Sequence, residues 1–452
     1  MNIPVPDRIA PAADLGHVHF IGIGGAGLSA IARLMHQLGI PVSGSDAQDS
    51  AVVAALRSEG ITCFVGHVGA QVADADTVIA STAVRPDNPE VVEAQRLGLR
   101  LWPRSAGLQS VLLGRTVVAV AGTHGKTTTT AMLTVALQEA GFDPTFAIGA
   151  EVESLGTNAR LGSGDIAVVE ADESDGAFLV YTPRLKIITN VDADHLDHWG
   201  SPEAYESAFT EFHRSNGRSI AADPRFADVV ASFAGDADVR GHDLVIEGGR
   251  TIFRVTARGH DLGTVELEVP GRHYAQDALL ALAAGLELGG DPAALIRGLA
   301  RHRGAKRRME FLGTAAGVTV YDSYAHHPTE ISGDLEAARS LAGDGRLVVV
   351  FQPHLVSRTR LFGVDMGRAL SAADLVFVAD LYLAREDPDP DVTSAVVADA
   401  VSGPPTRLAG PVDHAAVVVR PELRAGDLVL TLGAGDVTTV GPRLLELLEN
   451  TA

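Results

Sequence analysis

The sequence predicts an α/β protein of three domains, each built on a parallel sheet with helices on both faces. Short apolar runs recur along the whole chain, and each is followed by a glycine- or aspartate-rich turn and an Ala/Leu-rich helical pattern. This alternation is typical of parallel sheets covered by helices. The chain has 452 residues, more than one ordinary domain accommodates. Two of its strand-to-helix turns are also rich in glycine, as phosphate-binding turns are.

The alternating pattern divides into three blocks, at residues 1–112, 113–303 and 304–452. We expect a Rossmann-like N-terminal domain, a central P-loop ATPase domain with a parallel sheet, and a C-terminal domain that is again Rossmann-like. A short basic connector, residues 301–306, joins the second block to the third. The blocks do not look like copies of one another, so the chain is not a repeat protein.

The composition argues against two classes of partner. Lys and Arg number 36 against 57 Asp and Glu, which gives a formal net charge of −21. Such a chain repels nucleic acid and anionic membrane surfaces, and no apolar run approaches the ~20 residues that span a bilayer. A single cysteine, Cys63, excludes an internal disulfide framework, and we expect it to be a small buried side chain. With no signal peptide visible, these features predict a soluble, cytoplasmic protein without nucleic-acid or membrane-inserted partners.

The most informative segment is the apolar run Val117–Ala121, which is followed by Gly122-Thr123-His124-Gly125-Lys126-Thr127-Thr128 and a helical pattern. Backbone N–H groups of such a loop point into one concavity, and the helix N-terminus adds partial positive charge. We expect Lys126 against β- and γ-phosphate oxygens, and the Thr127 hydroxyl within reach of Mg²⁺. The usual pattern has its first glycine at position 120, which is Val here. The loop therefore differs from that of most nucleotide-driven motors and switches.

A second glycine-rich turn lies near the N-terminus. Gly22, Gly24 and Gly27 match G-x-G-x-x-G between a predicted strand and a predicted helix over residues 28–38, and Asp46 ends another strand about 20 residues further on. The motif indicates that a backbone turn approaches an anionic group closely. A dinucleotide and the diphosphate of a UDP-sugar satisfy it equally well, so an NAD-dependent dehydrogenase is the rival function. A tight packing turn without a ligand is the structural alternative.

Acidic and histidine side chains follow two further strands of the central block. One strand ends at Glu170, which is our candidate ligand for Mg²⁺ beside the phosphate loop. We expect Asp172 and Asp175, just beyond it, to lie in a solvated acidic loop. A strand at 187–190 is followed by a cluster of Asp and His residues, in which His195 is expected to ligate a second metal ion or to contact one through water.

The C-terminal block carries a different set of side chains at the ends of its predicted strands. A strand at 318–322 leads to Tyr324-Ala325-His326-His327-Pro328, with Pro328 placed to begin a helix. Histidines at the carboxyl end of a strand lie where open α/β sheets bind ligands. The next strand, 347–351, leads to Arg358 and Arg360. An arginine here can hold a carboxylate or phosphoryl oxygens, although we expect Arg360 on the surface.

These segments, in this order, resemble the Mur ligases, the ATP-dependent amide-forming enzymes of peptidoglycan precursor synthesis. The resemblance extends over almost the whole chain. Its motifs are G-I-G-G-A-G at 22–27, G-T-H-G-K-T-T-T at 122–129, E-A-D-E-S-D at 170–175, T-N-V-D-A-D-H at 189–195, G-R-H at 271–273, K-R-R at 306–308, Y-A-H-H-P-T-E at 324–330 and F-Q-P-H at 351–354.

The resemblance implies a role for each domain: residues 1–112 would bind the UDP-substrate, 113–303 ATP, and 304–452 the amino-acid and nucleotide side of the reaction. The implied ATP contacts are Gly122, Thr123, His124, Gly125, Lys126, Thr127, Thr128, Asp277 and Arg308. The implied UDP-substrate contacts are Gly22, Gly24, Gly25, Gly27 and Asp46. The implied metal ligands are Thr127, Glu170 and His195, and the implied amino-acid-side residues are Tyr324, His326 and Arg358. The catalytic residues would be Lys126, His326 and Arg358.

The implied activity is an ATP-dependent ligation. The matching branch of the family joins L-alanine to the lactyl carboxylate of UDP-N-acetylmuramate through an acyl phosphate, and releases ADP and phosphate. His326 is the candidate general base for the alanine amine, and binding of the amino acid is its equal alternative. A murein tripeptide ligase of peptidoglycan recycling is the alternative function, and a nucleotide-switched regulatory protein is the non-enzymatic one. We expect a monomer or a weak homodimer that uses ATP and Mg²⁺.

Three positions depart from the family pattern. Asp277 stands where the family usually has an Asn that faces the adenine, and Asp cannot donate a hydrogen bond to the base. Leu355 stands where an Arg is frequent, which removes one candidate clamp for the amino-acid carboxylate. Asp322-Ser323 replaces a pair of acids. Residues 196–217 contain no Lys, so we predict no carbamylated lysine of the kind that sister enzymes use.

Overall fold

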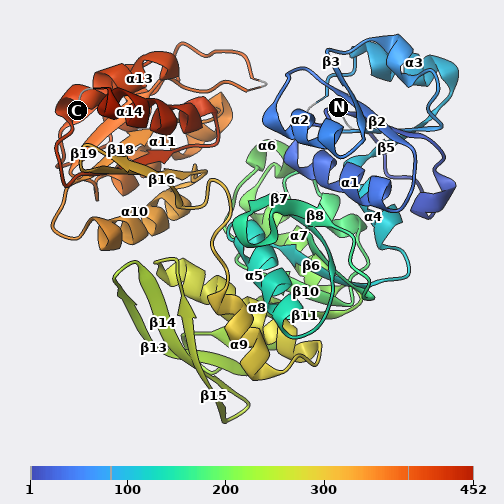
Figure 1. The fold of residues 1–452 in the computed structure, drawn as a ribbon, viewed down its shortest axis with the longest axis horizontal. Helices are drawn as coiled ribbons and strands as arrows, with labels where there is room; N and C mark the ends of the chain where they lie inside the picture. The colour runs from blue at the N-terminus through green and yellow to red at the C-terminus, as the bar shows by residue number, and fades with distance from the viewer. Residues whose placement is uncertain (1–2, 82–83, 385, 451–452) are drawn as a thin grey trace. The chain divides into compact units, whose positions relative to one another are not determined.

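The N-terminal part of the computed structural model is a five-stranded parallel sheet in the order β3-β2-β1-β4-β5 (Figure 1). The structure describes residues 3–81, 84–384 and 386–450. The strands are β1 (Val18–Ile21), β2 (Val42–Asp46), β3 (Thr62–Val65), β4 (Thr77–Ala80) and β5 (Arg100–Pro103). The helices are α1 (Ala26–Gln37), α2 (Ala51–Ser58), α3 (Pro89–Leu97) and α4 (Arg104–Leu112). Because β1 lies between β2 and β4, the turn after β1 is at the topological switch point, where open α/β sheets bind ligands.

Local sequence accounts for these elements. All four residues of β1 are buried, as expected for a central parallel strand. The Ser50 hydroxyl caps α2, and the Asn88 side chain caps α3 with Pro89 at its first position. Helix α1 begins two residues earlier than the predicted start at residue 28, so Gly27 lies in its first turn. Cys63 is only half-buried on the edge strand β3, where we expected it to be enclosed.

The central sheet has ten strands in the order β15-β14-β13-β12-β11-β10-β6-β9-β7-β8. Its parallel core contains β6 (Thr116–Ala121), β7 (Thr145–Val152), β9 (Ile166–Glu170), β10 (Leu185–Ile188), β11 (Arg218–Ala221) and β12 (Val229–Ser232), with β8 (Thr157–Arg160) antiparallel at the edge. The helices are α5 (Lys126–Glu139), α6 (Leu196–Trp199), α7 (Pro202–Arg214), α8 (Arg272–Glu287) and α9 (Pro292–Ala300). Strand β6 lies between β9 and β10. The loops that follow these three strands therefore leave the same edge of the sheet.

Three strands of this sheet were not predicted: β13 (Val239–Glu247), β14 (Arg250–Ala257) and β15 (His260–Leu267). Two-residue turns join them, and both residues of each turn have positive φ: Gly248 and Gly249 in the first, Arg258 and Gly259 in the second. Turns of this kind favour tight antiparallel hairpins. The central sheet is mostly parallel, as expected, and these three strands extend it beyond the parallel core.

The C-terminal sheet has the order β16-β17-β21-β18-β19-β20, with β16 antiparallel to β17 and the other pairs parallel. Its strands are β16 (Glu310–Ala315), β17 (Val318–Ser323), β18 (Leu347–Phe351), β19 (Leu375–Ala379), β20 (Thr406–Gly410) and β21 (Leu428–Leu432). The helices are α10 (Pro328–Ala342), α11 (Val356–Leu370), α12 (Ala395–Ala398), α13 (Val412–Val419) and α14 (Val440–Glu449). Helices α10 and α11 pack against each other, as do α13 and α14 (Figure 1).

The chain forms two compact units. The first runs to Arg240 and includes Thr256–Leu262 and Asp277–Leu299; the second comprises Gly241–Val255, Gly263–Gln276 and the chain from Ala300 onward. The N-terminal sheet and the parallel part of the central sheet thus belong to the first unit, and one apolar core extends through both, whereas most of β13, β14 and β15 belongs to the second unit. The predicted three-domain boundaries stay a prediction. No helix within the described residues is both long enough and apolar enough for a membrane crossing.

Candidate active site

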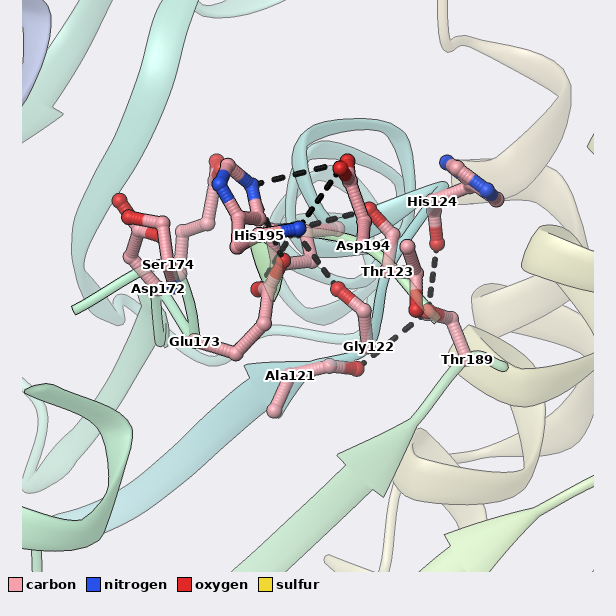
Figure 2. A network of polar contacts seen from close by, with 12 residues as sticks. Ala121, Gly122, Thr123, His124, Asp172, Glu173, Ser174, Thr189, Asp194 and His195 are labelled. Carbon is pink, nitrogen blue, oxygen red and sulfur yellow. Dashed lines mark hydrogen bonds and ion pairs between the residues drawn. The ribbon is translucent and has the colours of Figure 1, made fainter. Parts of the chain in front are cut away.

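The phosphate loop connects β6 to α5 and is held in shape by residues that follow β10. Gly122 has φ 133°, and a Cβ added there would lie 2.0 Å from the Thr189 hydroxyl oxygen. That hydroxyl donates to the His124 carbonyl at 2.5 Å (Figure 2). The Asn190 side chain accepts from the His124 amide N–H and donates to the same carbonyl, both at 3.0 Å. We predicted residues 189 and 190 within a strand. They instead lie just past its end, where their side chains fix the loop.

Lys126 is the first residue of α5, and its ammonium folds back over the loop. Nζ donates to the carbonyls of Gly122 at 2.7 Å and Thr123 at 3.0 Å, and lies 2.8 Å from Glu173 Oε2. Burial opposes the charge of Lys126, but the carboxylates around it outweigh burial and raise its pKa. The lysine is therefore a cation that lies over the loop, and the phosphate contact expected of it stays a prediction.

Glu173 belongs to the E-A-D-E-S-D motif at 170–175, but no role was predicted for it. Its side chain is 1% exposed, and burial raises its pKa to about 7, although the Lys126 charge opposes this. The second carboxylate oxygen lies 4.0 Å from His195 Nε2, and Asp194 Oδ2 lies 3.7 Å from the same nitrogen. Figure 2 shows the Glu173 side chain running toward Gly122 and His195. Glu173 therefore links the lysine to the loop that carries His195.

Two of the three predicted metal ligands lie in contact. The Thr127 hydroxyl donates to Glu170 Oε2 at 2.9 Å, and the Gly149 N–H donates to the same oxygen at 2.7 Å. A Cβ at Gly149 would lie 2.7 Å from that oxygen, so only glycine leaves room for the carboxylate. A hydroxyl and a carboxylate are oxygen donors of the kind that Mg²⁺ prefers. His195, the third predicted ligand, adopts the left-handed conformation with φ 52° and lies beside Glu173 instead.

The expectation that Asp172 and Asp175 form a solvated loop was wrong. Arg104, the first residue of α4, donates from Nη2 to Asp172 Oδ2 at 2.5 Å and to Asp175 Oδ2 at 3.3 Å. Both acids also hold their own loop, because Asp172 Oδ1 accepts from the Ser174 N–H and Asp175 Oδ1 from the Ala177 N–H. Burial opposes ionisation of Asp172, but Arg104 and Lys126 together hold its pKa well below the ordinary value. The acids are ion-paired supports of the loop.

The N-terminal glycine turn is braced by the neighbouring strand β2. The N–H groups of Gly22 and Ile23 donate to the Ser45 carbonyl, and the Gly24 N–H donates to Asp46 Oδ2 at 2.9 Å. A Cβ at Gly24 would lie 2.8 Å from that oxygen. Gly25 is the N-cap of α1 and provides no capping side chain, so the first N–H groups of the helix remain available for an anion. In this structure Asp46 holds the turn itself.

A buried polar network that the sequence did not reveal lies beside this turn. Glu90 of α3 is fully buried, and its two carboxylate oxygens bind His19 Nε2 at 2.9 Å and His67 Nδ1 at 2.7 Å. The Ser45 hydroxyl donates to Glu90 at 2.6 Å. Burial alone would raise the pKa of Glu90, but these hydrogen bonds lower it below the ordinary value. Because the Ser45 carbonyl accepts hydrogen bonds from N–H groups of the glycine turn, the network around Glu90 stabilises the turn through Ser45.

The predicted amino-acid-side residues of the second unit form a cluster at the carboxyl ends of β17 and β18. His326 Nδ1 contacts the Tyr324 carbonyl at 2.9 Å, and the His326 N–H donates to Glu330 Oε2 at 3.1 Å. Arg308 lies 3.6 Å from the other Glu330 oxygen, with its guanidinium 5.5 Å from the centre of the Tyr324 ring. Glu330 was not predicted as a site residue. It lies in the first turn of α10, which begins at Pro328 as expected.

Arg358 lies in the first turn of α11, where its side chain is almost fully buried. Its Nη1 is 3.4 Å from His354 Nδ1, and the His354 ring stacks on Tyr382, a residue that the sequence analysis did not single out. Leu355 has φ 67°, an unusual conformation for a residue with a Cβ. Arg360 lies on the surface as expected, paired with Asp389. Of the two arginines, only Arg358 belongs to the cluster.

The Asp322-Ser323 departure has a structural counterpart. The Ser323 hydroxyl donates to Asp334 of α10, so an acid from a helix stands beside the position where the family has a second acid. Burial raises the pKa of Asp334 to about 7. Asp322 accepts from the hydroxyls of Thr431 and Thr438. Asp277, another departure, lies against the phosphate loop: a Cβ at Gly125 would be 2.5 Å from its Oδ1.

The glycine turn, the phosphate loop with its ion-paired lysine and the C-terminal histidines follow one another along the chain in the order found in Mur ligases, and sequence comparison agrees. The family model described as Mur ligase family, catalytic domain, matches residues 17–116. The Mur ligase middle domain matches residues 120–285, and the Mur ligase, glutamate ligase domain matches residues 307–435. The chain belongs to the Mur ligase family.

Individual relatives narrow the comparison. The UDP-N-acetylmuramate–L-alanine ligase of Nocardioides sp. (strain ATCC BAA-499 / JS614) is 59% identical over 99% of this chain and 100% of that protein. The enzyme of the same name from Kineococcus radiotolerans is 49% identical over 99% of both chains. Among solved structures, the UDP-N-acetylmuramate-alanine ligase of Thermotoga maritima matches with a TM-score of 0.85 at 30% identity, covering 96% of this chain and 100% of that one. A murein peptide ligase from Psychrobacter arcticus gives 0.73 at 26% identity, covering 96% and 99%.

Proposed function

We propose that this protein joins L-alanine to the lactyl carboxylate of UDP-N-acetylmuramate and converts ATP to ADP and phosphate, a step of peptidoglycan precursor synthesis. The observation that carries the proposal is the ion pair of Lys126 with the buried Glu173 over a phosphate loop, in a chain with full-length relatives that bear this activity in their names. A lysine held in this way supplies positive charge where a transferring phosphoryl group needs it.

The chemistry explains why such a site is needed. A carboxylate does not react with an amine at neutral pH, because oxide is a very poor leaving group. Transfer of the γ-phosphoryl group of ATP to the lactyl carboxylate forms an acyl phosphate, from which phosphate leaves. That transfer brings two anions together, and Lys126 reduces their repulsion. The phosphate loop, Gly122 to Thr128, presents backbone N–H groups to the phosphates, and we assign Asp277 and Arg308 to the nucleotide as well.

Thr127 and Glu170 are the residues that would hold Mg²⁺. Their oxygen atoms are suitable donors, and Gly149 leaves the space in which the carboxylate lies. His195, at the far side of Glu173, is assigned to a second ion. When bound, Mg²⁺ neutralises phosphate charge and orients the γ-phosphoryl group. Lys126 and the loop N–H groups position the same phosphates from the protein side.

The amino-acid step is assigned to the cluster of the second unit. Arg358 is buried and cationic, which suits it to the carboxylate of L-alanine. The attacking amine must lose a proton, and His326, whose Nδ1 is directed to the Tyr324 carbonyl, is the candidate base. Amino-acid binding is the equal alternative for His326. Attack on the acyl phosphate forms the amide bond and releases phosphate.

The UDP-substrate is assigned to the N-terminal glycine turn, at Gly22, Gly24, Gly25 and Gly27, with Asp46 as its brace. The substrates are small molecules, and a membrane-inserted partner has no role in this reaction. Because the reaction consumes ATP, we place it in the cytoplasm. A monomer or a weak homodimer remains our proposal for the oligomeric state.

Phosphate release from ATP, measured with UDP-N-acetylmuramate and one amino component at a time, tests the function. L-alanine, glycine, L-serine and the recycling tripeptide are compared. Release that requires both the UDP-sugar and L-alanine is the expected result. Release with the UDP-sugar and the tripeptide, but with none of the single amino acids, would assign the chain to recycling. If no component supports release, the proposed ligation is excluded.

A further inference from the structure

Arg104 is a charged residue of the first unit to which neither the motifs nor the proposed mechanism gives a role. It follows β5, begins α4, and its side chain is 21% exposed. Its nearest charged neighbours belong to the acidic loop after β9, and that loop also carries Glu173, the partner of Lys126. Arg104 therefore lies between the N-terminal sheet and the loop that holds the catalytic lysine.

One side of the guanidinium is fixed by two carboxylates. Nη2 donates to Asp172 at 2.5 Å, and both Nη2 and Nε donate to Asp175 at 3.3 and 3.4 Å. A planar guanidinium held along one edge by two acids has a defined orientation for its remaining N–H groups. The pairing with both carboxylates thus pre-orients the opposite edge of Arg104.

The opposite edge faces the glycine turn. A Cβ added at Gly27 would lie 3.3 Å from Arg104 Nη1, tighter than an ordinary contact, so the absence of a side chain at Gly27 leaves room for this nitrogen. Among the described residues, no hydrogen bond uses Nη1. Gly27 also lies in the first turn of α1. The N-terminus of this helix has no capping side chain, so it favours an anion. A cationic N–H group and a helix N-terminus thus meet at one place.

We propose that Arg104 binds an anionic oxygen of the UDP-substrate through Nη1, and this inference rests on the proposed function. The anion is either the diphosphate or the lactyl carboxylate, and both present an oxygen to a guanidinium in the same way. With the substrate bound, Arg104 connects it through Asp172 and Glu173 to Lys126. Occupation of the glycine turn then steadies the acidic loop on which the phosphate loop depends.

Calorimetric titration of the full chain tests the proposal, with UDP-N-acetylmuramate, UDP-N-acetylglucosamine and ATP as separate ligands. Arg104→Gln is expected to lose about 10- to 100-fold in affinity for UDP-N-acetylmuramate, the range for a hydrogen bond to a charged group, and to lose less for ATP. An equal loss with UDP-N-acetylglucosamine, which lacks the lactyl group, assigns Nη1 to the diphosphate. A loss confined to UDP-N-acetylmuramate assigns it to the carboxylate.

Arg33→Gln is the matched control. Arg33 also connects the N-terminal and central parts of the first unit, by pairing with Glu59 at 2.8 Å and with Asn158, but it lies further along α1 than the glycine turn. This variant should bind both UDP-sugars as the wild type does. If Arg104→Gln fails to fold, Arg104→Lys keeps the charge but not the fork, and should show a smaller loss for the UDP-sugars.

Two results separate the failure of this inference from the failure of the proposed function. UDP-sugar affinity that is unchanged in both Arg104 variants, with only ATP affinity weakened, would overturn the inference and reduce Arg104 to a support of the acidic loop. A wild-type protein that does not bind UDP-N-acetylmuramate at all would instead remove the proposed function itself.

Discussion

The first unit contains two glycine turns that share one design and differ in where their charge comes from. Both follow a central parallel strand and lead into a helix, at Gly22–Gly27 and at Gly122–Gly125. The second turn carries its own cation, Lys126, one residue beyond its last glycine. The first carries none, and the cation that faces it is Arg104, far along the chain. A site whose charge lies within its motif can be predicted from sequence, whereas a site whose charge comes from a distant element cannot.

The largest expected effect removes the charge from the second turn. Lys126→Ala takes away the cation that reduces repulsion between the γ-phosphoryl group and the substrate carboxylate, so turnover should fall by about 10³-fold or more. Binding of UDP-N-acetylmuramate should persist, because the first turn does not use this lysine. Phosphate-release kinetics and calorimetric titration check the two parts. Loss of UDP-sugar binding in a folded variant would refute the assignment of the two substrates to two turns.

A pair of alanine substitutions compares how tightly the two turns are enclosed. At Gly22 the Cβ of an alanine would lie 3.9 Å from the nearest atom, so the only cost is the backbone strain of φ 85°. We expect the free energy of unfolding to fall by about 1–2 kcal/mol. At Gly122 the Cβ also meets the Thr189 hydroxyl at 2.0 Å, and a loss of about 3–5 kcal/mol is expected. Urea unfolding measures both. Equal losses would mean that Thr189 yields to the new side chain.

The strands show which parts of the fold could be predicted from the sequence and which could not. Strand β18 was predicted with its observed bounds, because a buried parallel strand is a continuous apolar run in the sequence. The half-exposed strands β13–β15 lack that signal, although Gly248-Gly249 marks a hairpin.

Site residues follow the same rule. Lys126, Thr127 and Glu170 were predicted from the phosphate loop and the strand ends, and the structure brings them together. Arg104 and Tyr382 were missed because their partners are set by tertiary packing, which no local spacing encodes. Asp172 was misjudged for the same reason: an acidic loop looks solvated until the arginine that pairs with it is known.

The Glu173 carboxyl gives the second turn a pH dependence that the first turn does not share. Burial raises the pKa of Glu173 from an ordinary 4.5 to about 7, so the folded protein binds the proton more tightly than the unfolded chain does. The folded state is therefore favoured at low pH, and stability contributed by this group falls as pH rises from about 4.5 to 7. Glu173→Gln should remove this part of the slope.

Urea unfolding of wild type and Glu173→Gln at pH 5, 6, 7 and 8 checks this expectation. The difference in free energy of unfolding between the two proteins should change between pH 5 and 7 and level off above 7, which serves as the internal control. A difference that stays constant across the whole range would mean that Lys126 keeps Glu173 ionised throughout.

The smallest expected effect concerns the brace of the first turn, Asp46. Its Oδ2 accepts from the Gly24 N–H at 2.9 Å, and its Oδ1 accepts from the Gln48 N–H at 3.2 Å in the loop that follows β2, so only Oδ2 holds the glycine turn. Asp46→Asn keeps one acceptor for Gly24 and should weaken only the second bond, with a stability loss of about 0.5–1.5 kcal/mol. Affinity for UDP-N-acetylmuramate should remain close to that of the wild type. A loss of affinity as large as that expected of Arg104→Gln would show that Asp46 binds the substrate directly. The first turn would then resemble the second, because a ligand-binding side chain predicted from its own motif would contact the substrate.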